Sequence, residues 1–373
     1  MQAALLFATA LVALPPQPAG VPWPTRQWPT AALPDGVRKE AVAAALAAVD
    51  RLDPELGETR AVVVVQGGRI VAEKYRNGYS EITRLISWSM AKSITQALVG
   101  LAVGKGLVEL DRPMGNPRWP AGDPRGAVTW RQWEQMVDGI DYHEIGVRDP
   151  VRNDAARMLF GEGRLDVAAF AASLPQIHPA GTHWNYNTAG VELVDDALGR
   201  VFAPGAGADE RRARVAEVLA KELFGPLGMT SALPEFDAAG TFMGGSLVYA
   251  TARDYARFGL LYLRDGMWDG RRILPAGWVD FARTRGPAAN GSTYGAGFWI
   301  TPPVGDPTRV HALTPDGPAD LFTAQGHEGQ LITIVPSKDL VVVRLGHLDD
   351  THGWHALGQW MQALVAAFPD VHN

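Results

Sequence analysis

Short, dense runs of apolar residues near both ends of the chain predict β-strands. Residues 61–66 and 69–75 are rich in β-branched side chains and are separated by a Gly-Gly pair, which is typical of a tight hairpin. Residues 330–335 and 340–345 repeat this arrangement around a turn that begins with proline. Shorter strand-like runs lie between the two hairpins. They comprise residues 244–249, 294–300 and 321–325.

A helical spacing of apolar residues governs much of the remaining chain. Over residues 36–49 and 87–103, apolar side chains recur every three or four positions, which predicts helices with a buried face. Thr251 is a suitable N-cap for a further helix that ends at residue 263, and a closing helix is expected over residues 354–368. The helices expected in the middle of the chain are 129–137, 151–160, 165–174, 189–201 and 211–223.

Strands at both ends with helices between them predict an α+β fold. We expect residues 25–105 and 243–373 to form one α/β sheet lobe that is closed by both ends of the chain. Residues 106–242 are rich in Pro, Gly and Trp and contain few β-branched runs, so they are expected to form an inserted, mainly helical lobe. Residues 1–24 are expected to be an export leader followed by a Pro-rich linker.

The leader prediction depends on the apolar run over residues 3–14, which only Thr9 interrupts. This run is shorter than the roughly 20 residues of a membrane-spanning helix, but it is long enough for a signal-peptide core. It is followed by a segment with many prolines, residues 15–24. We therefore expect an exported or periplasmic protein with no stable membrane span. The alternative is a buried helix in a cytoplasmic protein.

Composition narrows the classes of function. Among 373 residues, 47% are hydrophobic and 20% are charged, which is ordinary for a globular protein. The net charge of -6 and the lack of a Lys/Arg-rich run argue against a nucleic-acid partner. The sequence contains no cysteine, so it has no disulfide, thiolate metal site or cysteine nucleophile. We expect neither a cofactor nor a metal ion, and oligomeric state stays open.

One serine and one lysine stand out at the start of the helix over residues 87–103. Ser89 and Lys92 are three positions apart, so their side chains share a helix face and can meet as nucleophile and base. The helix N-terminus also favours negative charge that develops at Ser89. The alternative is a capping serine and a lysine that extends to solvent. A lysine among so many apolar residues is costly to bury without a task.

Two later segments offer polar side chains that would complete such a site. Residues 179–190 place Tyr186 and Thr188 after a Pro/Gly turn and before a helix. Residues 325–330 place His327 between glycines at the start of a strand, where glycine lets the backbone approach a ligand closely. The alternatives are a packed tyrosine ring with a capping threonine, and a bulged hairpin edge.

Together, these three segments resemble the serine β-lactamase and penicillin-binding-protein superfamily, and within it the class C-like branch that includes esterases and 6-aminohexanoate-dimer hydrolases. Ser89 to Lys92 matches the Ser-x-x-Lys motif, Tyr186 to Thr188 matches the Tyr-x-Asn/Ser/Thr element, and His327 to Gly329 matches the Lys-Thr-Gly or His-x-Gly strand. The resemblance covers about residues 62–365. It is particularly close over residues 84–95, 244–246, 251–254, 266–275 and 294–299.

The resemblance implies a β-lactamase/transpeptidase-like fold, an antiparallel sheet flanked by helices, and acyl transfer through Ser89. Lys92 and Tyr186 would share the role of base. Backbone N–H groups of Ser89 and Gln330 would hold the oxyanion. The residues that the resemblance implies for substrate binding are Thr188, His327, Glu328 and Gly329.

The substrate expected is a small amide or ester, as for a 6-aminohexanoate-oligomer hydrolase or a carboxylesterase. Thr188 stands where class C β-lactamases carry Asn, and His327 replaces the lysine of the third motif. A β-lactamase or D-amino-acid peptidase is the alternative activity, and a non-hydrolytic penicillin-binding or sensor protein is the alternative of another class. Asp138 stands where relatives usually carry Ser, and sequence assigns it no role. Glu144 is expected in a solvated loop or lining the cleft.

Overall fold

The central element is a six-stranded antiparallel sheet in the order β2-β1-β11-β10-β9-β8. The computed structural model describes residues 11–288, 290, 293–348 and 353–371. The strands of this sheet are β1 (Glu58–Gln66), β2 (Arg69–Tyr75), β8 (Trp299–Ile300), β9 (Phe322–Gly326), β10 (Gln330–Val335) and β11 (Leu340–His347).

Pairing between the two predicted hairpins closes the sheet. Gly67 and Gly68 both have positive φ (58° and 72°), the conformation that a two-residue hairpin turn needs. β1 then pairs antiparallel with β11, with Val64 opposite Val342. The first and last parts of the chain are therefore adjacent strands, as the sequence predicts.

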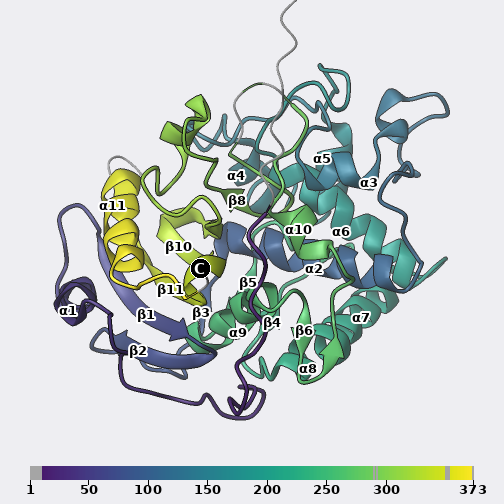
Figure 1. Ribbon diagram of the computed structural model, residues 1–373. Helices are drawn as coiled ribbons and strands as arrows, with labels where there is room; N and C mark the ends of the chain where they lie inside the picture. The colour runs from purple at the N-terminus through teal and green to yellow at the C-terminus, as the bar shows by residue number, and fades with distance from the viewer. Residues whose placement is uncertain (1–10, 289, 291–292, 349–352, 372–373) are drawn as a thin grey trace, which may run out of the picture.

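Alternate residues of β1 enter two different cores, one on each face of the sheet. Val62 and Val64 pack with α1 (Lys39–Leu46) and α11 (Gly353–Ala366). Val63 belongs to the larger core on the opposite face. That core is built on α2 (Ala91–Gly104) and α9 (Ala252–Leu263), and α9 contacts β1, β10 and β11. In Figure 1, α2 crosses the centre of the molecule between the sheet and the helical lobe.

The segment between α2 and β5 (Val248–Ala250) is mainly helical, as predicted. Its helices are α3 (Trp130–Glu134), α4 (Asp154–Leu159), α5 (Val167–Ser173), α6 (Thr188–Phe202), α7 (Ala208–Val218) with the π-turn Leu219–Phe224, and α8 (Gly225–Leu227). Short strands β3 (Leu85–Ile86) and β4 (Leu233–Pro234) flank β5, and β6 (Met267–Trp268), β7 (Arg271–Arg272) and α10 (Trp278–Ala282) follow α9.

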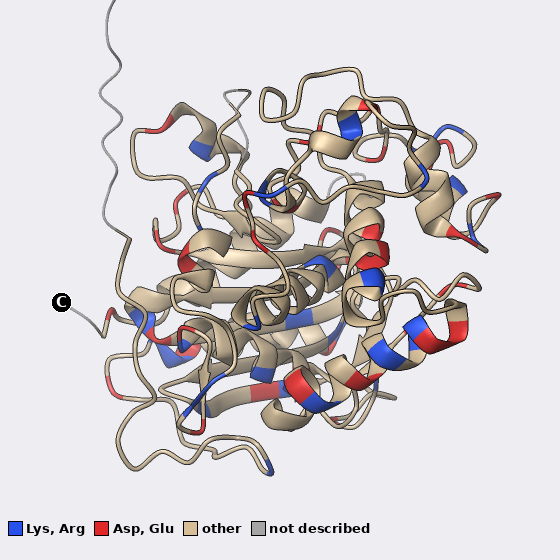
Figure 2. Ribbon diagram, turned by 90° about the vertical axis from the view of Figure 1, so that its right-hand side faces the viewer, with Lys and Arg blue, Asp and Glu red and all other residues tan. Residues whose placement is uncertain are grey.

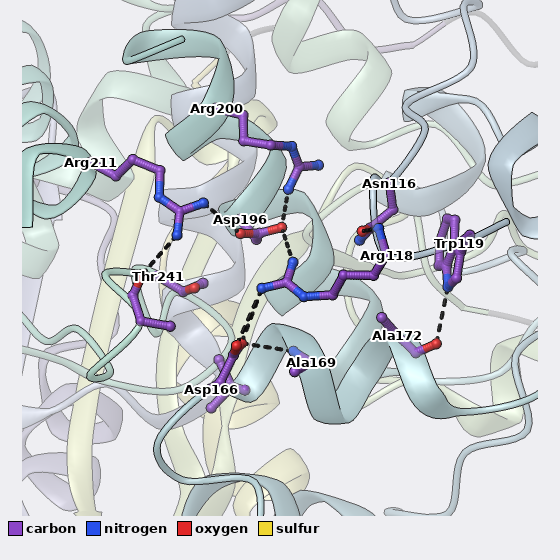
Figure 3. Close-up of polar contacts among 12 residues, drawn as sticks. Asn116, Arg118, Trp119, Asp166, Ala169, Ala172, Asp196, Arg200, Arg211 and Thr241 are labelled. Atoms are coloured by element: carbon purple, nitrogen blue, oxygen red, sulfur yellow. Dashed lines mark hydrogen bonds and ion pairs between the residues drawn. The ribbon is translucent and has the colours of Figure 1, made fainter. Parts of the chain in front are cut away.

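A buried carboxylate ties the helical lobe together (Figure 3). Asp196 on α6 is 1% exposed and accepts hydrogen bonds from Arg118 at 2.8 Å and from Arg200 and Arg211. Arg118 also pairs with Asp166, the N-cap of α5. Since Arg211 lies on α7, this network joins α5, α6 and α7. Charged residues also line α7, whereas the sheet carries few of them (Figure 2).

The predicted strands in two places are shorter than expected. Residues 294–300 form a strand only at Trp299 and Ile300, because Gly297 has φ 72° and the chain turns back so that Tyr294 bridges to Trp299. The run over residues 244–249 pairs only from Val248 onward.

The Pro-rich segment predicted as a linker packs against the sheet lobe. Arg264 donates a hydrogen bond to Pro15 O at 3.2 Å, and the rings of Trp23 and Trp268 lie 5.0 Å apart. Residues 1–10, which carry much of the predicted leader, lie outside the described residues. No helix in the described part of the chain is both long and apolar enough to cross a membrane.

Candidate active site

Ser89 lies in a tight turn at the start of α2. It is the middle residue of the 3₁₀ turn Trp88–Met90, so the nucleophile does not sit on the α-helix itself, where the sequence pattern places it. Trp88 adopts φ 44°, a left-handed conformation that is unusual for a bulky side chain. Ser87 anchors the turn to β5, since its N–H donates a hydrogen bond to Val248 O at 2.8 Å. Ser89 is partly exposed, so a substrate can reach its hydroxyl.

Lys92 is held directly against the nucleophile. Its Nζ lies 2.8 Å from Ser89 Oγ and donates a hydrogen bond to Gly245 O at 2.7 Å. Lys92 is 2% exposed, and burial lowers its pKa to about 8, against the opposing field of Glu144 and two other acids. The pairing predicted from the sequence is present, with a lysine that loses its proton more readily than usual.

Tyr186 completes the group from the opposite side. The ammonium of Lys92 lies 4.9 Å from the centre of its ring, a cation–π distance. The ring also stacks on Trp299 at 5.4 Å and meets the edge of Tyr294 at 6.0 Å. Burial raises the pKa of Tyr186 well above 10, while a hydrogen bond with Ser89 lowers it. Tyr186 therefore keeps its proton, so the phenolate that a shared base role requires is disfavoured.

A buried cap sets the position of Tyr186. The next residue, Asn187, is the N-cap of α6 and accepts a hydrogen bond from Gly190 N. Asp138 Oδ1 accepts from Asn187 Nδ2 at 3.0 Å and from Ile140 N at 2.9 Å. Burial raises the pKa of Asp138 to about 6. Asp138, which sequence left without a role, thus orients the cap beside Tyr186.

Glu144, which the sequence predicts in a solvated loop or lining the cleft, contacts Thr188. Thr188 is fully buried, and its hydroxyl donates a hydrogen bond to Glu144 Oε2 at 2.6 Å. The partly exposed Glu144 carboxylate also acts electrostatically on Lys92 and Tyr186. The hydroxyl of Thr188 is thus engaged with Glu144, and the substrate contact expected of Thr188 stays a prediction.

The third predicted motif, His327 to Gly329, packs next to Trp88. The ring of His327 is exposed and meets the Trp88 ring edge-on at 5.4 Å. Glu328 has φ 60°, and its carboxylate accepts from Trp88 Nε1 at 3.3 Å and lies 3.0 Å from His347 Nδ1. Gly329 is buried, and its carbonyl accepts from Arg344. His327 is thus exposed and Glu328 partly exposed, whereas Gly329 is buried.

Gln330, the predicted second oxyanion donor, lies on the strand next to the one that contacts the turn of Ser89. A Cβ added to Gly326 would lie 2.2 Å from Ser87 O, so the end of β9 touches the turn that carries Ser89. Gln330 lies on β10, opposite Gly326, with its side chain bonded to Gly346. His327 follows Gly326 in the chain, and the oxyanion role of the Gln330 N–H stays a prediction.

Two acids behind Lys92 were not found from the sequence. Glu192 and Asp195 lie on the buried face of α6, and both have raised pKa values because of burial. Glu192 Oε1 accepts a hydrogen bond from Gly245 N at 3.2 Å. A Cβ at Gly244 would lie 2.5 Å from Asp195 Oδ2. Contacts between such distant segments leave no local sequence pattern.

The described residues contain no group of three or more His, Cys, Asp or Glu side chains arranged to hold a metal ion.

Residues 57–366 match the model of the Beta-lactamase family. The chain belongs to that family. A 6-aminohexanoate-dimer hydrolase from Paenarthrobacter ureafaciens is 27% identical over 311 residues, which cover 80% of this chain and 76% of the relative. Protein Rv1367c from Mycobacterium tuberculosis is 28% identical over 314 residues, with 69% and 75% covered.

Solved structures share the fold of this Beta-lactamase family member. A Bacillus anthracis protein presented as a candidate 6-aminohexanoate-dimer hydrolase aligns with a TM-score of 0.68 at 21% identity, covering 95% of this chain and 90% of the other. A class C β-lactamase from Rhodobacter sphaeroides aligns with a TM-score of 0.59 at 19% identity, covering 88% and 99%. The predicted family and the α+β fold are confirmed.

Proposed function

We propose that the protein is a serine hydrolase that cleaves an amide or ester bond through an acyl-enzyme on Ser89. The contact of 2.8 Å between Lys92 Nζ and Ser89 Oγ carries this proposal. It joins a partly exposed hydroxyl to a buried amine, and the family membership of the chain supports the same chemistry.

In the first step, Ser89 Oγ attacks the substrate carbonyl and Lys92 takes its proton. With a pKa of about 8, roughly a tenth of the Lys92 side chains are neutral at pH 7. The hydrogen bond to Gly245 O keeps Nζ next to Ser89. Lys92 is thus the base of acylation.

Tyr186 supplies the proton that the leaving group needs. Its raised pKa keeps the phenol protonated, and its ring lies over Lys92. Tyr186 donates its proton to the leaving amine or alcohol and regains one from Lys92. A water molecule then attacks the acyl carbonyl, which releases the acid and restores Ser89.

The tetrahedral oxyanion is held by the N–H groups of Ser89 and His327. The approach of Gly326 to the Ser87 carbonyl supports the second donor, because it brings the end of β9 to the turn before α2. Such a donor is typically worth roughly 3 kcal/mol in the transition state. The N–H of Gln330, opposite Gly326 on β10, is the alternative donor expected from the sequence.

A linear amide or ester is the substrate class that we favour. The accessible side chains include the acids Glu144 and Glu328 and the imidazole of His327, and the two acids favour a substrate with a positively charged group, such as the amine end of an aminohexanoate amide. The Paenarthrobacter ureafaciens relative is named for hydrolysis of a linear amide dimer. D-amino-acid peptidase or β-lactamase activity is the second candidate, since chains of the same fold carry those names.

A single substrate panel tests the proposal. It comprises p-nitrophenyl esters of short acids, 6-aminohexanoate oligomers, D-amino-acid amides and nitrocefin. We expect ester and linear-amide turnover that is lost in Ser89→Ala. Turnover that survives in Ser89→Ala, or covalent labelling without any turnover, would contradict the proposal, and the second outcome would favour a sensor protein.

A further inference from the structure

The buried carboxyl of Glu192 and the ammonium of Lys92 both contact Gly245. Glu192 is fully buried on α6. Its Oε1 accepts a hydrogen bond from Gly245 N at 3.2 Å, while Gly245 O accepts one from Lys92 Nζ at 2.7 Å. Gly245 therefore stands between the carboxyl and the ammonium and is held by both.

The contact requires glycine at this place. A Cβ added to Gly245 would lie 2.6 Å from Glu192 Oε1 and 2.8 Å from Thr188 Cγ2. Neither atom can withdraw easily, because both belong to side chains on the buried face of α6. The backbone of Gly245 is thus clamped between α6 and α2.

The second oxygen of the Glu192 carboxyl has no role in that clamp. Glu192 Oε2 is buried and forms no hydrogen bond with the described residues. A buried carboxyl oxygen without a donor is costly in its charged form. Its burial next to a lysine therefore couples the charge of one group to the charge of the other.

We propose, on the basis of the hydrolase function proposed above, that Glu192 is a positioning residue that holds Gly245 against Lys92 and controls how readily Lys92 gives up its proton. The carboxylate favours the ammonium form of Lys92, and the neutral carboxyl releases it. Glu192 does not touch the substrate and acts only through Lys92.

Other charged groups also act on the ionisation of Lys92, of Glu192 or of the neighbouring Asp195. Glu144 and Asp195 also favour the charged form of Lys92. Asp237 and Glu144 disfavour ionisation of Glu192, and Glu134 does the same for Asp195. Since Glu134 does not act on Lys92 in this set, it offers a matched control among the buried glutamates.

The test follows the titration of Lys92 by NMR in protein that carries ¹³Cε-labelled lysine. Few signals are expected, because the only lysines are Lys39, Lys74, Lys92, Lys105, Lys221 and Lys338. The Lys92 signal is the one that disappears in Lys92→Ala. Glu192→Gln keeps an oxygen for Gly245 N and removes the charge.

We expect the Lys92 midpoint in Glu192→Gln to fall by about one pH unit and to stay unchanged in Glu134→Gln. The acidic limb of kcat/KM should move by the same amount. If Glu192→Gln does not fold, Glu192→Met has similar length without charge and carries the same expectation. An unchanged midpoint in the folded variant would overturn the proposal.

The NMR midpoint does not depend on turnover, which separates the two proposals. A wild-type protein that hydrolyses nothing, together with a lowered Lys92 midpoint in Glu192→Gln, would refute the hydrolase and support the coupling. A purely structural Glu192 would change thermal stability and leave the midpoint in place, which would refute the coupling.

Discussion

At the scale of single residues, burial shifts the pKa values of Lys92 and Tyr186 in opposite directions. Both side chains are buried beside Ser89, and in each case burial favours the uncharged form. A lysine with a lowered pKa is more often neutral and can act as a base. A tyrosine with a raised pKa stays protonated and can act as a proton donor. In the mechanism that we propose, the shared base role predicted from the sequence separates into a base, Lys92, and an acid, Tyr186.

The first prediction concerns the pH dependence of the rate. Because the neutral form of Lys92 is the active one, kcat/KM on a p-nitrophenyl ester should rise with pH through the Lys92 pKa of about 8. Lys92→Ala should lower kcat by at least about a hundredfold. The exposed Lys105, which pairs with Glu222, provides Lys105→Ala as the control. A rate that falls through pH 8 would contradict the assignment.

The second prediction separates Tyr186 from Lys92. A proton donor matters most for a poor leaving group, so Tyr186→Phe should slow amide hydrolysis at least about a hundredfold and affect a p-nitrophenyl ester far less. Steady-state kinetics on a matched ester and amide of one acid would measure this difference. Equal losses on both substrates would show that Tyr186 does not protonate the leaving group.

Sequence alone singles out Ser89, Lys92 and Tyr186 as candidates because each belongs to a short local pattern, and the structure brings the three side chains together. It cannot identify Glu192, whose role depends on Gly245, a residue distant in the chain. It cannot tell which N–H at the end of the hairpin would join Ser89 in an oxyanion hole, because the register between β9 and β10 decides which residue faces Ser87.

At the scale of elements, the site depends on how two helices begin. α2 begins after a 3₁₀ turn that sequence periodicity cannot distinguish from an α-helix, and α6 begins at the Asn187 cap. The two hairpins and α9 with its Thr251 cap are predicted correctly, because their turns and caps are local. The shortened strand at residues 294–300 depends on a tertiary bridge instead.

The third prediction tests the start of α6. Asp138→Ala removes the acceptor of Asn187 Nδ2 and Ile140 N, and a buried donor left unsatisfied costs roughly 1 to 3 kcal/mol. Chemical denaturation should show a loss of that size. Asp138→Asn keeps one acceptor oxygen and should lose less. Equal stability of wild type and Asp138→Ala would show that Asp138 does not hold the cap.

At the scale of the whole molecule, the active site lies where α2 passes between the sheet and the helical lobe (Figure 1). The closure of the sheet by both chain ends is predictable, because two valine-rich hairpins have no other partners of similar strength. The packing of residues 11–24 on the sheet lobe is not predictable, since Pro-rich sequence lacks a periodicity that would show a buried face.

The fourth prediction concerns stability and pH. Burial raises the pKa of Glu134 from 4.5 to about 8, so the folded protein holds this proton more tightly than the unfolded chain. The stability that this proton contributes is complete below about pH 4.5 and is lost as pH rises through about 8. At pH 9, Glu134→Gln should therefore be more stable than wild type by on the order of 5 kcal/mol, since each pKa unit is worth about 1.36 kcal/mol.

Thermal unfolding at pH 5, 7 and 9 would measure this effect. The melting temperature of wild type should fall more steeply with pH than that of Glu134→Gln. Parallel curves for the two proteins would show that Glu134 is ionised in the folded state.

The most direct measurement is the location of a covalent adduct after reaction with a fluorophosphonate. Peptide mass spectrometry should find the phosphonyl group on Ser89 in the wild-type protein and none in Ser89→Ala, with much slower labelling in Lys92→Ala. An adduct on a different residue, or ester turnover with Ser89 never labelled, would contradict the mechanism.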